Sequence, residues 1–364
     1  MKQKVYSDFY QGKKVLVTGH TGFKGTWLTG VLKTLGANVC GYALCPPTEP
    51  SLFELTHMDE SINSVIGDIR DLDHLMAVFA EFEPEIVIHM AAQPLVRESY
   101  KNPHLTYETN VMGTVNVLEC VRNTPSVKSV INVTTDKVYL NREWDRGYVE
   151  TDVLDGYDPY SNSKSCSELV THSYVQSFLQ DMGIAVSTMR AGNVIGGGDF
   201  AVDRIIPDCV RAAFNGEPVI LRNPHSTRPY QHVLEPLFAY LMVAMKQYEN
   251  MDYAGNYNVG PEDTNNVPTG VLADRFCYHW GEGMSVKIQG DGGPHEAGFL
   301  KLDCSHLKQT FLWEPTWSID ETLIRVVEFE KIRKNLVDIN ADDAAVAMEL
   351  KKCMCNQIND FISK

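Results

Sequence analysis

The feature that most constrains the fold is an apolar strand, a glycine loop and a helix in succession near the start of the chain. Residues 13–19 read KKVLVTG, which is typical of a buried strand, and residues 22–36 read GFKGTWLTGVLKTLG, with apolar side chains at helical spacing and a final glycine as a stop. Gly19, Gly22 and Gly25 form the pattern G-x-x-G-x-x-G at their junction. This order predicts the first βα unit of a Rossmann-type fold.

Helix continues to follow strand through the first half of the chain. The sequence predicts further strands at residues 38–44, 64–68, 84–92, 129–135 and 184–190, and helices at residues 71–82, 105–123 and 158–183. These strands are apolar throughout instead of alternating with polar residues, which indicates a parallel sheet covered on both faces. We therefore expect an α/β fold with a doubly wound parallel sheet.

The amino-acid composition changes after about Gly192, where glycine, proline, asparagine and arginine accumulate. These residues indicate loops, and loops often carry ligands. We assign residues 1–190 to a Rossmann domain that binds a dinucleotide, with its sheet completed by later segments. Residues 191–335 would mainly form a smaller, discontinuous C-terminal substrate-binding lobe. Residues 336–364 read as an amphipathic C-terminal helical tail.

The charge and composition exclude several classes of protein. The formal net charge of −15 disfavours nucleic-acid binding, because an acidic chain repels phosphate backbones. The N-terminal residues lack the apolar core of a signal peptide, and the apolar stretch at residues 238–245 is far too short to span a bilayer. The nine cysteines are scattered, as expected of reduced thiols. We expect a cytoplasmic protein with no metal site and no membrane contact.

The glycine loop also predicts a ligand. Glycines let a backbone turn tightly and approach a pyrophosphate, and the following helix N-terminus supplies N–H groups and the positive end of a dipole. The candidate cofactor-binding residues of this loop are Gly19, Thr21, Gly22, Phe23, Lys24 and Gly25. A tight βα turn without a ligand is the alternative.

One residue that is common in NAD sites is missing. The second predicted strand ends in YAL (residues 42–44), where an acid often binds the ribose 2′-hydroxyl. Lys24 could instead meet a 2′-phosphate, so the residues leave NAD and NADP open. Asp68 and Ile69 follow the third strand and could bracket an adenine, although Asp68 could equally cap the next helix.

Tyr160 and Lys164 form the pattern Y-x-x-x-K, which places both side chains on one face of a helix. A lysine ammonium close to a phenol favours the phenolate and lowers the tyrosine pKa, so Tyr160 could act as a base. Thr135 ends an upstream strand and could hydrogen-bond the same substrate oxygen. A solvated helix face usually explains such a pair, but here the glycine loop, the parallel sheet and the threonine accompany it in the order that a redox site needs.

Together these features resemble the extended short-chain dehydrogenase/reductase superfamily over roughly residues 12–330, most of the span of a domain pair. The resemblance is carried by the glycine loop, HMAAQ at 89–93, and Thr135 with Tyr160 and Lys164. Within the superfamily, GHTGFKGTWL, VTTDKVY, GYDPYSNSK, RAGNVIGGGDF and RPYQHVLEPL resemble the CDP-glucose 4,6-dehydratase family.

The resemblance implies NAD as the cofactor and CDP-glucose as the substrate, and it implies that the missing acid is normal for this subgroup. It extends the candidate cofactor site to Ala91, Ala92, Gln93 and Asn110. Tyr160 and Lys164 would contact the cofactor as well. The family usually pairs subunits through helices such as 106–124 and 160–180, so a homodimer or homotetramer is expected.

Asp136 and Lys137 directly follow Thr135 and exceed what oxidation alone needs. A 4,6-dehydration oxidises C4 of the sugar, removes the C5 proton, expels the C6 hydroxyl as water and returns the hydride to C6. It therefore needs a base at C5 and an acid at C6 in addition to Tyr160 at the C4 hydroxyl. Asp136 and Lys137 are the candidates, although many sugar-nucleotide dehydratases are expected to carry glutamate in place of this lysine.

The sequence leaves the roles of the pair open. Lysine is normally protonated, with a pKa near ~10.4, so Lys137 needs desolvation or the nearby charge of Lys164 to act as a base. It could instead stay charged and stabilise the C5 enolate. Asp136 must be protonated to donate a proton, which the adjacent Lys137 opposes. A structural ion pair without a catalytic role is the remaining alternative.

Arginines in the second half of the chain suit a diphosphate, which arginine binds with a rigid fork. They are Arg190, Arg204, Arg222 and Arg228. The resemblance implies Asn193, Arg204 and Arg228 as substrate-binding residues. His295 and Glu296 could reach the nucleoside. The alternative functions are an epimerase or reductase of nucleotide sugars, a 4,6-dehydratase for another nucleotide-linked hexose, and a non-catalytic sensor.

Overall fold

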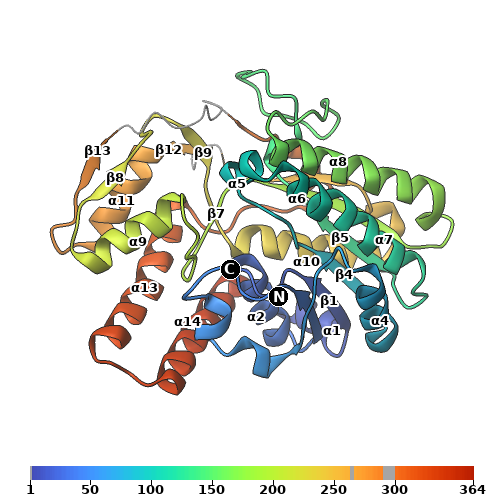
Figure 1. The fold of residues 1–364 in the computed structure, drawn as a ribbon, viewed down its shortest axis with the longest axis horizontal. Helices are drawn as coiled ribbons and strands as arrows, with labels where there is room; N and C mark the ends of the chain where they lie inside the picture. The colour runs from blue at the N-terminus through green and yellow to red at the C-terminus, as the bar shows by residue number, and fades with distance from the viewer. Residues whose placement is uncertain (1, 263–265, 290–299) are drawn as a thin grey trace.

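A parallel seven-stranded sheet forms the centre of the molecule, in a computed structural model that describes residues 2–262, 266–289 and 300–364 (Figure 1). The strands lie in the order β11-β6-β5-β4-β1-β2-β3, and every neighbouring pair is parallel. Their bounds are β1 Lys14–Thr18, β2 Asn38–Ala43, β3 Asn63–Ile66, β4 Ile86–His89, β5 Ser129–Val133, β6 Ala185–Ala191 and β11 Asn256–Val259. The predicted Rossmann-type sheet is confirmed.

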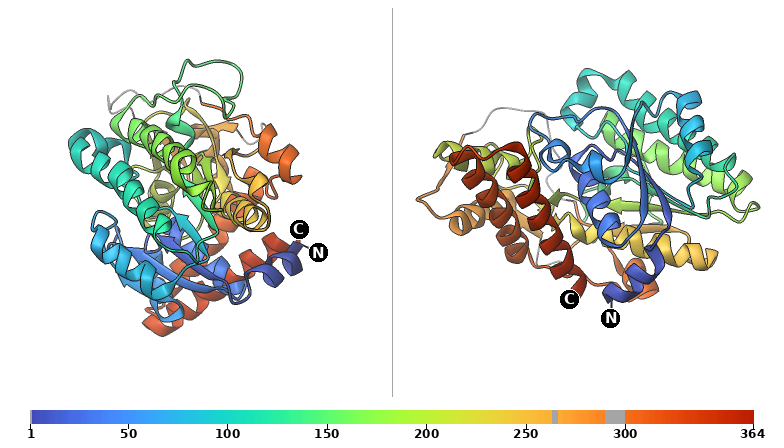
Figure 2. Two further views of the ribbon diagram at one scale, coloured as in Figure 1. Left: turned by 90° about the vertical axis from the view of Figure 1, so that its right-hand side faces the viewer. Right: turned by 90° about the horizontal axis from the view of Figure 1, so that it is seen from below.

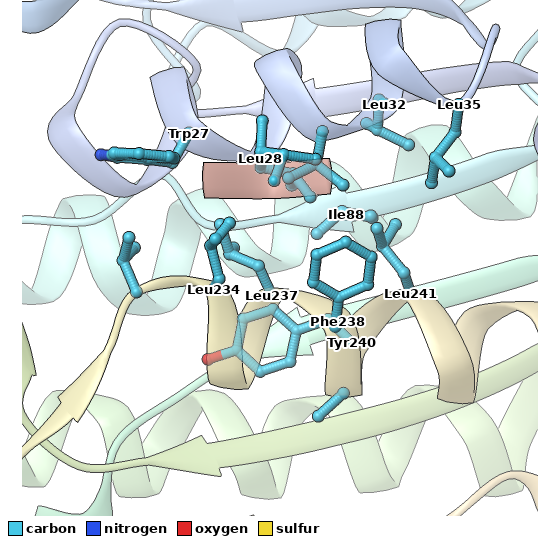
Figure 3. Close-up of a cluster of buried hydrophobic side chains, with 14 of the residues drawn as sticks. Trp27, Leu28, Leu32, Leu35, Ile88, Leu234, Leu237, Phe238, Tyr240 and Leu241 are labelled. Atoms are coloured by element: carbon cyan, nitrogen blue, oxygen red, sulfur yellow. The ribbon is translucent and has the colours of Figure 1, made fainter. Parts of the chain in front are cut away.

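Successive strand residues point into two different cores, one on each face of the sheet. In β1, Val15 and Val17 belong to one core, whereas Leu16 belongs to the other. Helices α2 (Phe23–Thr34) and α10 (Leu234–Glu249) cover the first core, and α4 (Leu72–Phe82), α7 (Gly113–Arg122) and α8 (Pro159–Tyr174) cover the second. Figure 2 shows these layers from two sides, and Figure 3 shows apolar side chains of α2 and α10 pointing toward each other. Burial on both faces explains why the strands lack polar alternation.

Several helices differ from the sequence prediction. The helix expected at 105–123 consists of α6 (Pro103–Tyr107), a π-helical turn (Glu108–Met112) and α7, and α8 likewise continues into a π-helical turn at Val175–Leu179. The additional helices are α1 Lys2–Tyr10, α3 Leu52–Leu55 and α5 Val96–Lys101. Short 3-10 helices span Met58–Ser61, Asp136–Val138 and Met251–Tyr253. Helix α1 is fixed to the core because the Tyr10 hydroxyl donates to the carbonyl O of Leu241 at 2.7 Å.

A smaller lobe lies beside the sheet, at the left of Figure 1, and has an apolar core of its own. It contains α9 Ile205–Asn215, α11 Thr269–Trp280, and the strand pairs β8 Val219–Leu221 with β13 Val286–Ile288 and β9 Thr227–Pro229 with β12 Asn266–Pro268. β7 Val194–Ile195 pairs with β10 Gln231–His232, and α12 spans Ser305–Phe311. Between these segments the chain returns to the sheet as α10 and β11, so the lobe is discontinuous in sequence.

The C-terminal segment packs against the rest of the molecule. α13 (Ile319–Asp338) contributes to the core of the lobe and to the core beneath α2, and α14 (Asp343–Ser363) packs against α2. The two termini lie side by side in Figure 2, where α1 meets α14. Over the described ranges, no helix is long and apolar enough to cross a membrane.

Candidate active site

The strand order reverses between β1 and β4, and α/β folds bind ligands at such a switch point. Gly19 follows β1 with a φ of +81°, and a Cβ at this position would lie 2.8 Å from the backbone N of Ala91, which follows β4. Thr18 ties the two loops together, because its Oγ1 accepts hydrogen bonds from the N–H groups of Met90 and Ala91, both at 3.1 Å. Glycine is required at position 19 by its backbone conformation and by this close approach.

The other two glycines of the loop do different things. A Cβ on Gly25 would lie 2.1 Å from the carbonyl O of Gly19, so this residue permits the loop to pack on α2. Gly22 is the N-cap of α2, and a Cβ there would make only an ordinary contact, at 3.5 Å from the same oxygen. No side chain caps this helix start, so the first N–H groups of α2 can bind an anion.

The predicted residues around the loop hold neighbouring segments in place. The Thr21 hydroxyl donates to the carbonyl O of Leu44 at the end of β2, and Phe23 begins α2. Ala91 and Ala92 lie in the turn after β4. The backbone N–H of Gln93 donates to Asn110 Oδ1 at 2.8 Å, and Asn110 Nδ2 donates to Ser163 Oγ on α8 at 2.9 Å. Asn110 thus connects the loop after β4 to α8.

Asp68 and Ile69 lie just beyond β3. The Arg70 guanidinium binds the Asp68 carboxylate at 2.6 Å and lowers its pKa. Asp71, not Asp68, caps α4, because its side chain accepts a hydrogen bond from the backbone N–H of His74. Ile69 is buried against Gly113, where a Cβ would lie 2.4 Å from the Ile69 side chain.

Lys24 points toward α10, away from the end of β2. Its Nζ donates to the Tyr240 hydroxyl at 2.8 Å. Burial, together with repulsion from Lys164 and Arg204, lowers the pKa of Lys24 to about 7. Since these neighbours surround Tyr160, the geometry argues against the predicted contact between Lys24 and a 2′-phosphate.

Tyr160 and Lys164 lie on the first turns of α8. Asp158 caps this helix by accepting a hydrogen bond from the Ser161 N–H at 3.0 Å, and proline occupies the first turn, where no N–H donor is needed. Lys164 Nζ donates to the carbonyl O of Val133, the last residue of β5, at 3.0 Å. The helix start and the strand end are therefore tied directly to each other.

Thr135, Tyr160 and Lys164 come together as predicted by their order, but their proton affinities differ from the expectation. Burial raises the pKa of Tyr160 to about 12, with the hydrogen bond between Tyr160 and Thr135 acting in the opposite direction. Burial lowers the pKa of Lys164 to about 8. The expected lowering of the tyrosine pKa considered the lysine charge and omitted desolvation, which dominates here. Tyr160 keeps its proton at neutral pH until a ligand changes its surroundings.

Asp136 is buried at the end of β5 with one carboxylate oxygen unpartnered. Oδ1 accepts a hydrogen bond from the Thr135 hydroxyl at 2.9 Å, and Lys137 Nζ lies 3.9 Å from the same atom. Within the described ranges, no donor reaches Oδ2. A buried oxygen without a partner is costly, so this atom indicates a ligand that brings a polar group. The 3.9 Å separation makes a purely structural ion pair a poor explanation for the two residues.

Gly192 makes room beside this oxygen. A Cβ on Gly192 would lie 2.8 Å from Pro229 Cγ and 3.2 Å from Asp136 Oδ2. From sequence, Gly192 was expected only to be part of a loop. Its signal was its position directly after β6, at the same sheet edge as Asp136.

The arginines differ in their surroundings. Arg190 is buried and forms two hydrogen bonds with Glu168, at 3.0 and 2.9 Å, so it is a structural residue and not a phosphate ligand. Arg222 pairs with Asp203 at 2.8 Å, toward the outside of the lobe. Sequence reasoning did not identify Glu168, although its position four residues after Lys164 places both on one face of α8.

The predicted substrate residues lie along the segments that follow β6. Arg204 pairs with Asp199 at 3.1 Å, and its charge acts on Tyr160, which places it at the site. Arg228 is buried in β9. Asn193 precedes β7, and its carbonyl O accepts a hydrogen bond from Gln231. The other two candidates, His295 and Glu296, lie outside the described residues.

No group of three metal-ligating side chains occurs among the residues that the structure describes. The candidate site therefore consists of a glycine loop at the start of α2 and a set of titratable groups at the end of β5 and on α8. Lys24 and Lys164 are buried lysines of this site.

Comparison with known proteins gives consistent results. The family model for GDP-mannose 4,6 dehydratase matches residues 16–326. The CDP-glucose 4,6-dehydratase of Salmonella typhimurium is 48% identical over 362 residues, which cover 98% of each chain. The structure of dTDP-glucose 4,6-dehydratase from Bacillus anthracis in complex with NAD has a TM-score of 0.73 and 21% identity, covering 89% of this chain and 98% of that one. UDP-glucose 4-epimerase from Thermotoga maritima, with UDP-glucose, has a TM-score of 0.75 and 22% identity, covering 89% and 99%.

Proposed function

Because the chain belongs to the GDP-mannose 4,6-dehydratase family, we propose that it is a nucleotide-sugar 4,6-dehydratase that converts CDP-D-glucose to CDP-4-dehydro-6-deoxy-D-glucose with NAD. Likeness over nearly the full length to a CDP-glucose 4,6-dehydratase supports the choice of nucleotide and hexose. The observation that carries the proposal is the unpartnered Oδ2 of Asp136 beside Tyr160, since oxidation alone would need no carboxyl group there.

The glycine loop suits NAD. Gly22 leaves the start of α2 uncovered for a diphosphate, and Gly19 and Gly25 allow the close packing that forms this cradle. Lys24 Nζ donates to the Tyr240 hydroxyl, so this lysine is not placed to recognise the 2′-phosphate of NADP. NAD, when bound, supplies the hydride acceptor for C4 and the hydride donor for C6.

Three groups of the chain would serve the oxidation. Tyr160, once it has lost its own proton, takes the proton of the C4 hydroxyl, with the Thr135 hydroxyl beside it to orient the sugar oxygen. Lys164 holds α8 against the end of β5 through Val133 and adds positive charge that favours the phenolate.

Asp136 and Lys137 would serve the elimination. Asp136 donates a proton from Oδ2 to the leaving C6 hydroxyl, the position that the structure leaves without a protein donor. Lys137, about one-third exposed, acts at C5. As the neutral amine it removes the C5 proton; as the ammonium it stabilises the enolate after another group has taken that proton. The C5 proton and the C6 hydroxyl leave together as water in the net reaction.

The test is incubation of the holoenzyme with CDP-, dTDP-, UDP- and GDP-glucose, followed by mass detection of products. We expect loss of one water from CDP-glucose. Asp136→Asn and Lys137→Ala should abolish that product while oxidation at C4 persists, and Asp152→Asn, in a surface ion pair with Arg146, is the matched control. Full dehydration by both variants would refute the roles. A C4 epimer of unchanged mass would identify an epimerase, and turnover of no sugar would identify a sensor.

We also propose a homodimer or homotetramer in the cytoplasm. Exposed apolar side chains on α6, on the π-helical turns and on α8 support pairing through these helices: Leu105, Tyr107, Met112, Leu169 and Phe178. Nine free cysteines suit a reducing compartment. Leu169→Glu should lower the mass in sedimentation, whereas Leu312→Glu, on another exposed surface, should not. An unchanged mass for Leu169→Glu would contradict pairing through α8.

A further inference from the structure

The segment that carries Thr135, Asp136 and Lys137 has little regular structure of its own. It leaves β5 at Val133 and contains only one 3-10 turn, Asp136–Val138. Backbone hydrogen bonds hold its two ends, from Thr134 N–H to the carbonyl O of Met189 and from Asp155 N–H to the carbonyl O of Val138, both at 3.0 Å. Between these points, side-chain contacts with other elements contribute to its conformation.

Two side chains anchor this segment, one on each side of the proton-transfer residues. Upstream, the Thr134 hydroxyl donates to Glu168 Oε1. Downstream, the Tyr139 hydroxyl accepts a hydrogen bond from Arg190 Nη1 at 2.8 Å and donates to Asn258 Oδ1 at 2.7 Å. Both anchors are buried.

Both anchoring hydroxyls hydrogen-bond to one ion pair, which Glu168 and Arg190 form. Arg190 Nε and Nη2 donate to Glu168 Oε1 and Oε2 at 3.0 and 2.9 Å, and each side chain is only 2% exposed. Glu168 lies on α8 and Arg190 on β6, so the pair joins the helix, the strand and the segment between them. Neither residue hydrogen-bonds to Tyr160 or Asp136 in the described structure.

Stability is a weak reason to keep such a pair. Removing two charges from water costs about as much as their attraction returns, and apolar residues of similar volume often do as well. What the pair provides here is geometry. Tyr160 and Lys164 are carried by α8, whereas Asp136 and Lys137 are carried by the segment, and Glu168 and Arg190 fix one relative to the other.

We propose that the Glu168–Arg190 ion pair positions Asp136 and Lys137 for water elimination, acting through the hydroxyls of Thr134 and Tyr139. Both charged residues are positioning residues and do not touch the substrate. The inference rests on the proposed function. It predicts that a loosened segment impairs elimination more than C4 oxidation, because the base for oxidation is carried by α8.

The anchors, not the ion pair, are the residues to change. Glu168→Gln would leave a buried arginine uncompensated, and the variant could fail to fold. Thr134→Val and Tyr139→Phe each remove one hydroxyl, keep the side-chain shape and leave the ion pair intact. The matched controls are Thr171→Val, which removes a buried hydroxyl further along α8, and Tyr10→Phe, which removes a buried tyrosine hydroxyl far from the site.

The holoenzyme is mixed with CDP-glucose in a single turnover, and two signals are followed. Reduced nicotinamide is measured by absorbance, and the 4-keto and 4-keto-6-deoxy sugars are separated by mass after borodeuteride trapping. In the anchor variants we expect reduced nicotinamide and the 4-keto sugar to accumulate, kcat to fall on the order of 10-fold, and KM to stay within about twofold of wild type, since a displacement of an ångström costs up to about 100-fold. Thermal unfolding and titration with CDP alone should match the controls.

The outcomes separate the two proposals. If the wild type forms no dehydrated product, the proposed function fails and the positioning role falls with it. If the wild type dehydrates but both anchor variants show wild-type partition between the two sugars, only the positioning role is refuted. Equal losses of oxidation and elimination, or equal losses in Thr171→Val and Tyr10→Phe, would also refute it.

Discussion

Gly25→Ala should destabilise the fold, whereas Gly22→Ala should leave the fold intact and weaken cofactor binding. A Cβ at position 25 would lie 2.1 Å from the carbonyl O of Gly19 and 2.7 Å from His20 Cα, and ordinary contact begins at 3.4 Å. The loop or α2 must therefore shift by 3.4 − 2.1 = 1.3 Å. Helix α2 cannot yield easily, because the Trp27 indole N–H donates to the carbonyl O of Gly197 at 3.0 Å and the helix packs on α10.

The expected cost for Gly25→Ala follows from these contacts. Overpacking a dense interior costs about 1–3 kcal/mol, and the clash here is with backbone atoms that cannot change rotamer. Alanine gains about 1 kcal/mol over glycine inside a helix, which offsets part of the cost. Since a contact at 2.1 Å belongs at the upper end of the overpacking range, we expect a net loss of about 2 kcal/mol in the free energy of unfolding without any ligand.

Gly22→Ala meets no comparable obstacle. Its Cβ would lie 3.5 Å from the nearest atom, and its φ of −78° suits any residue. The free energy of unfolding should change by no more than about 0.5 kcal/mol. NAD affinity should fall by about tenfold or more, about 1.4 kcal/mol, because the methyl group occupies the approach of the diphosphate to the start of α2.

Chemical denaturation of both variants without cofactor, followed by titration calorimetry with NAD, separates the two effects. A bound ligand stabilises the native state according to its concentration and affinity, so the unfolding midpoint in a series of NAD concentrations is an independent check. Gly25→Ala with wild-type stability would refute the packing argument. Gly22→Ala with wild-type NAD affinity would leave the glycine loop as a tight turn only.

Three further predictions test the site. Lys164→Met should gain up to about 3 kcal/mol of stability near pH 7, because the pKa of Lys164 falls from 10.5 to about 8 and the protonated form is disfavoured in the folded state. This gain should shrink as pH rises from 8 to 10.5, and equal gains in urea denaturation at pH 7 and pH 10 would contradict it. Gly192→Ala should lower turnover about tenfold, because its Cβ would lie 3.2 Å from Asp136 Oδ2, and it should also lower the melting temperature, because the Cβ would lie 2.8 Å from Pro229 Cγ; unchanged kinetics would argue against a ligand at Oδ2. Asp158→Ala should cost about 1 kcal/mol by removing the cap of α8, as measured by thermal unfolding, and no loss would show that Pro159 suffices.

The parts of the fold that depend on neighbours in sequence could be predicted. The strand before Gly19, the helix after it and the spacing of the three glycines are local signals, and each has a local physical cause. The sequence predicted that later segments complete the sheet, but it did not identify those segments as α10 and β11, because their apolar residues do not distinguish the sheet core from the core of the second lobe. The π-helical turn at Glu108–Met112 also lacks a local signal, since its residues are ordinary for an α-helix.

The errors about the site share one physical cause. Sequence shows which charges are present but not which of them are buried or paired. Lys164 was expected to lower the pKa of Tyr160, but burial raises that pKa. Arg190 was considered as a phosphate ligand, but its guanidinium is hydrogen-bonded to Glu168. Desolvation and pairing outweigh formal charge at short range, so both errors follow from reasoning with charges alone.

A short sequence motif does not by itself fix the geometry of its side chains. The residues Thr135, Asp136 and Lys137 are adjacent in sequence, yet adjacency does not place them, because the segment has only one short helical turn. By the proposal above, their arrangement depends on Glu168 and Arg190, which lie more distantly along the chain and outside the stretch VTTDKVY. A chain could therefore keep the motif and lose elimination by a change at its anchors. Conversely, transplanting the three residues onto another Rossmann strand should give oxidation without dehydration unless the anchoring pair is transplanted as well.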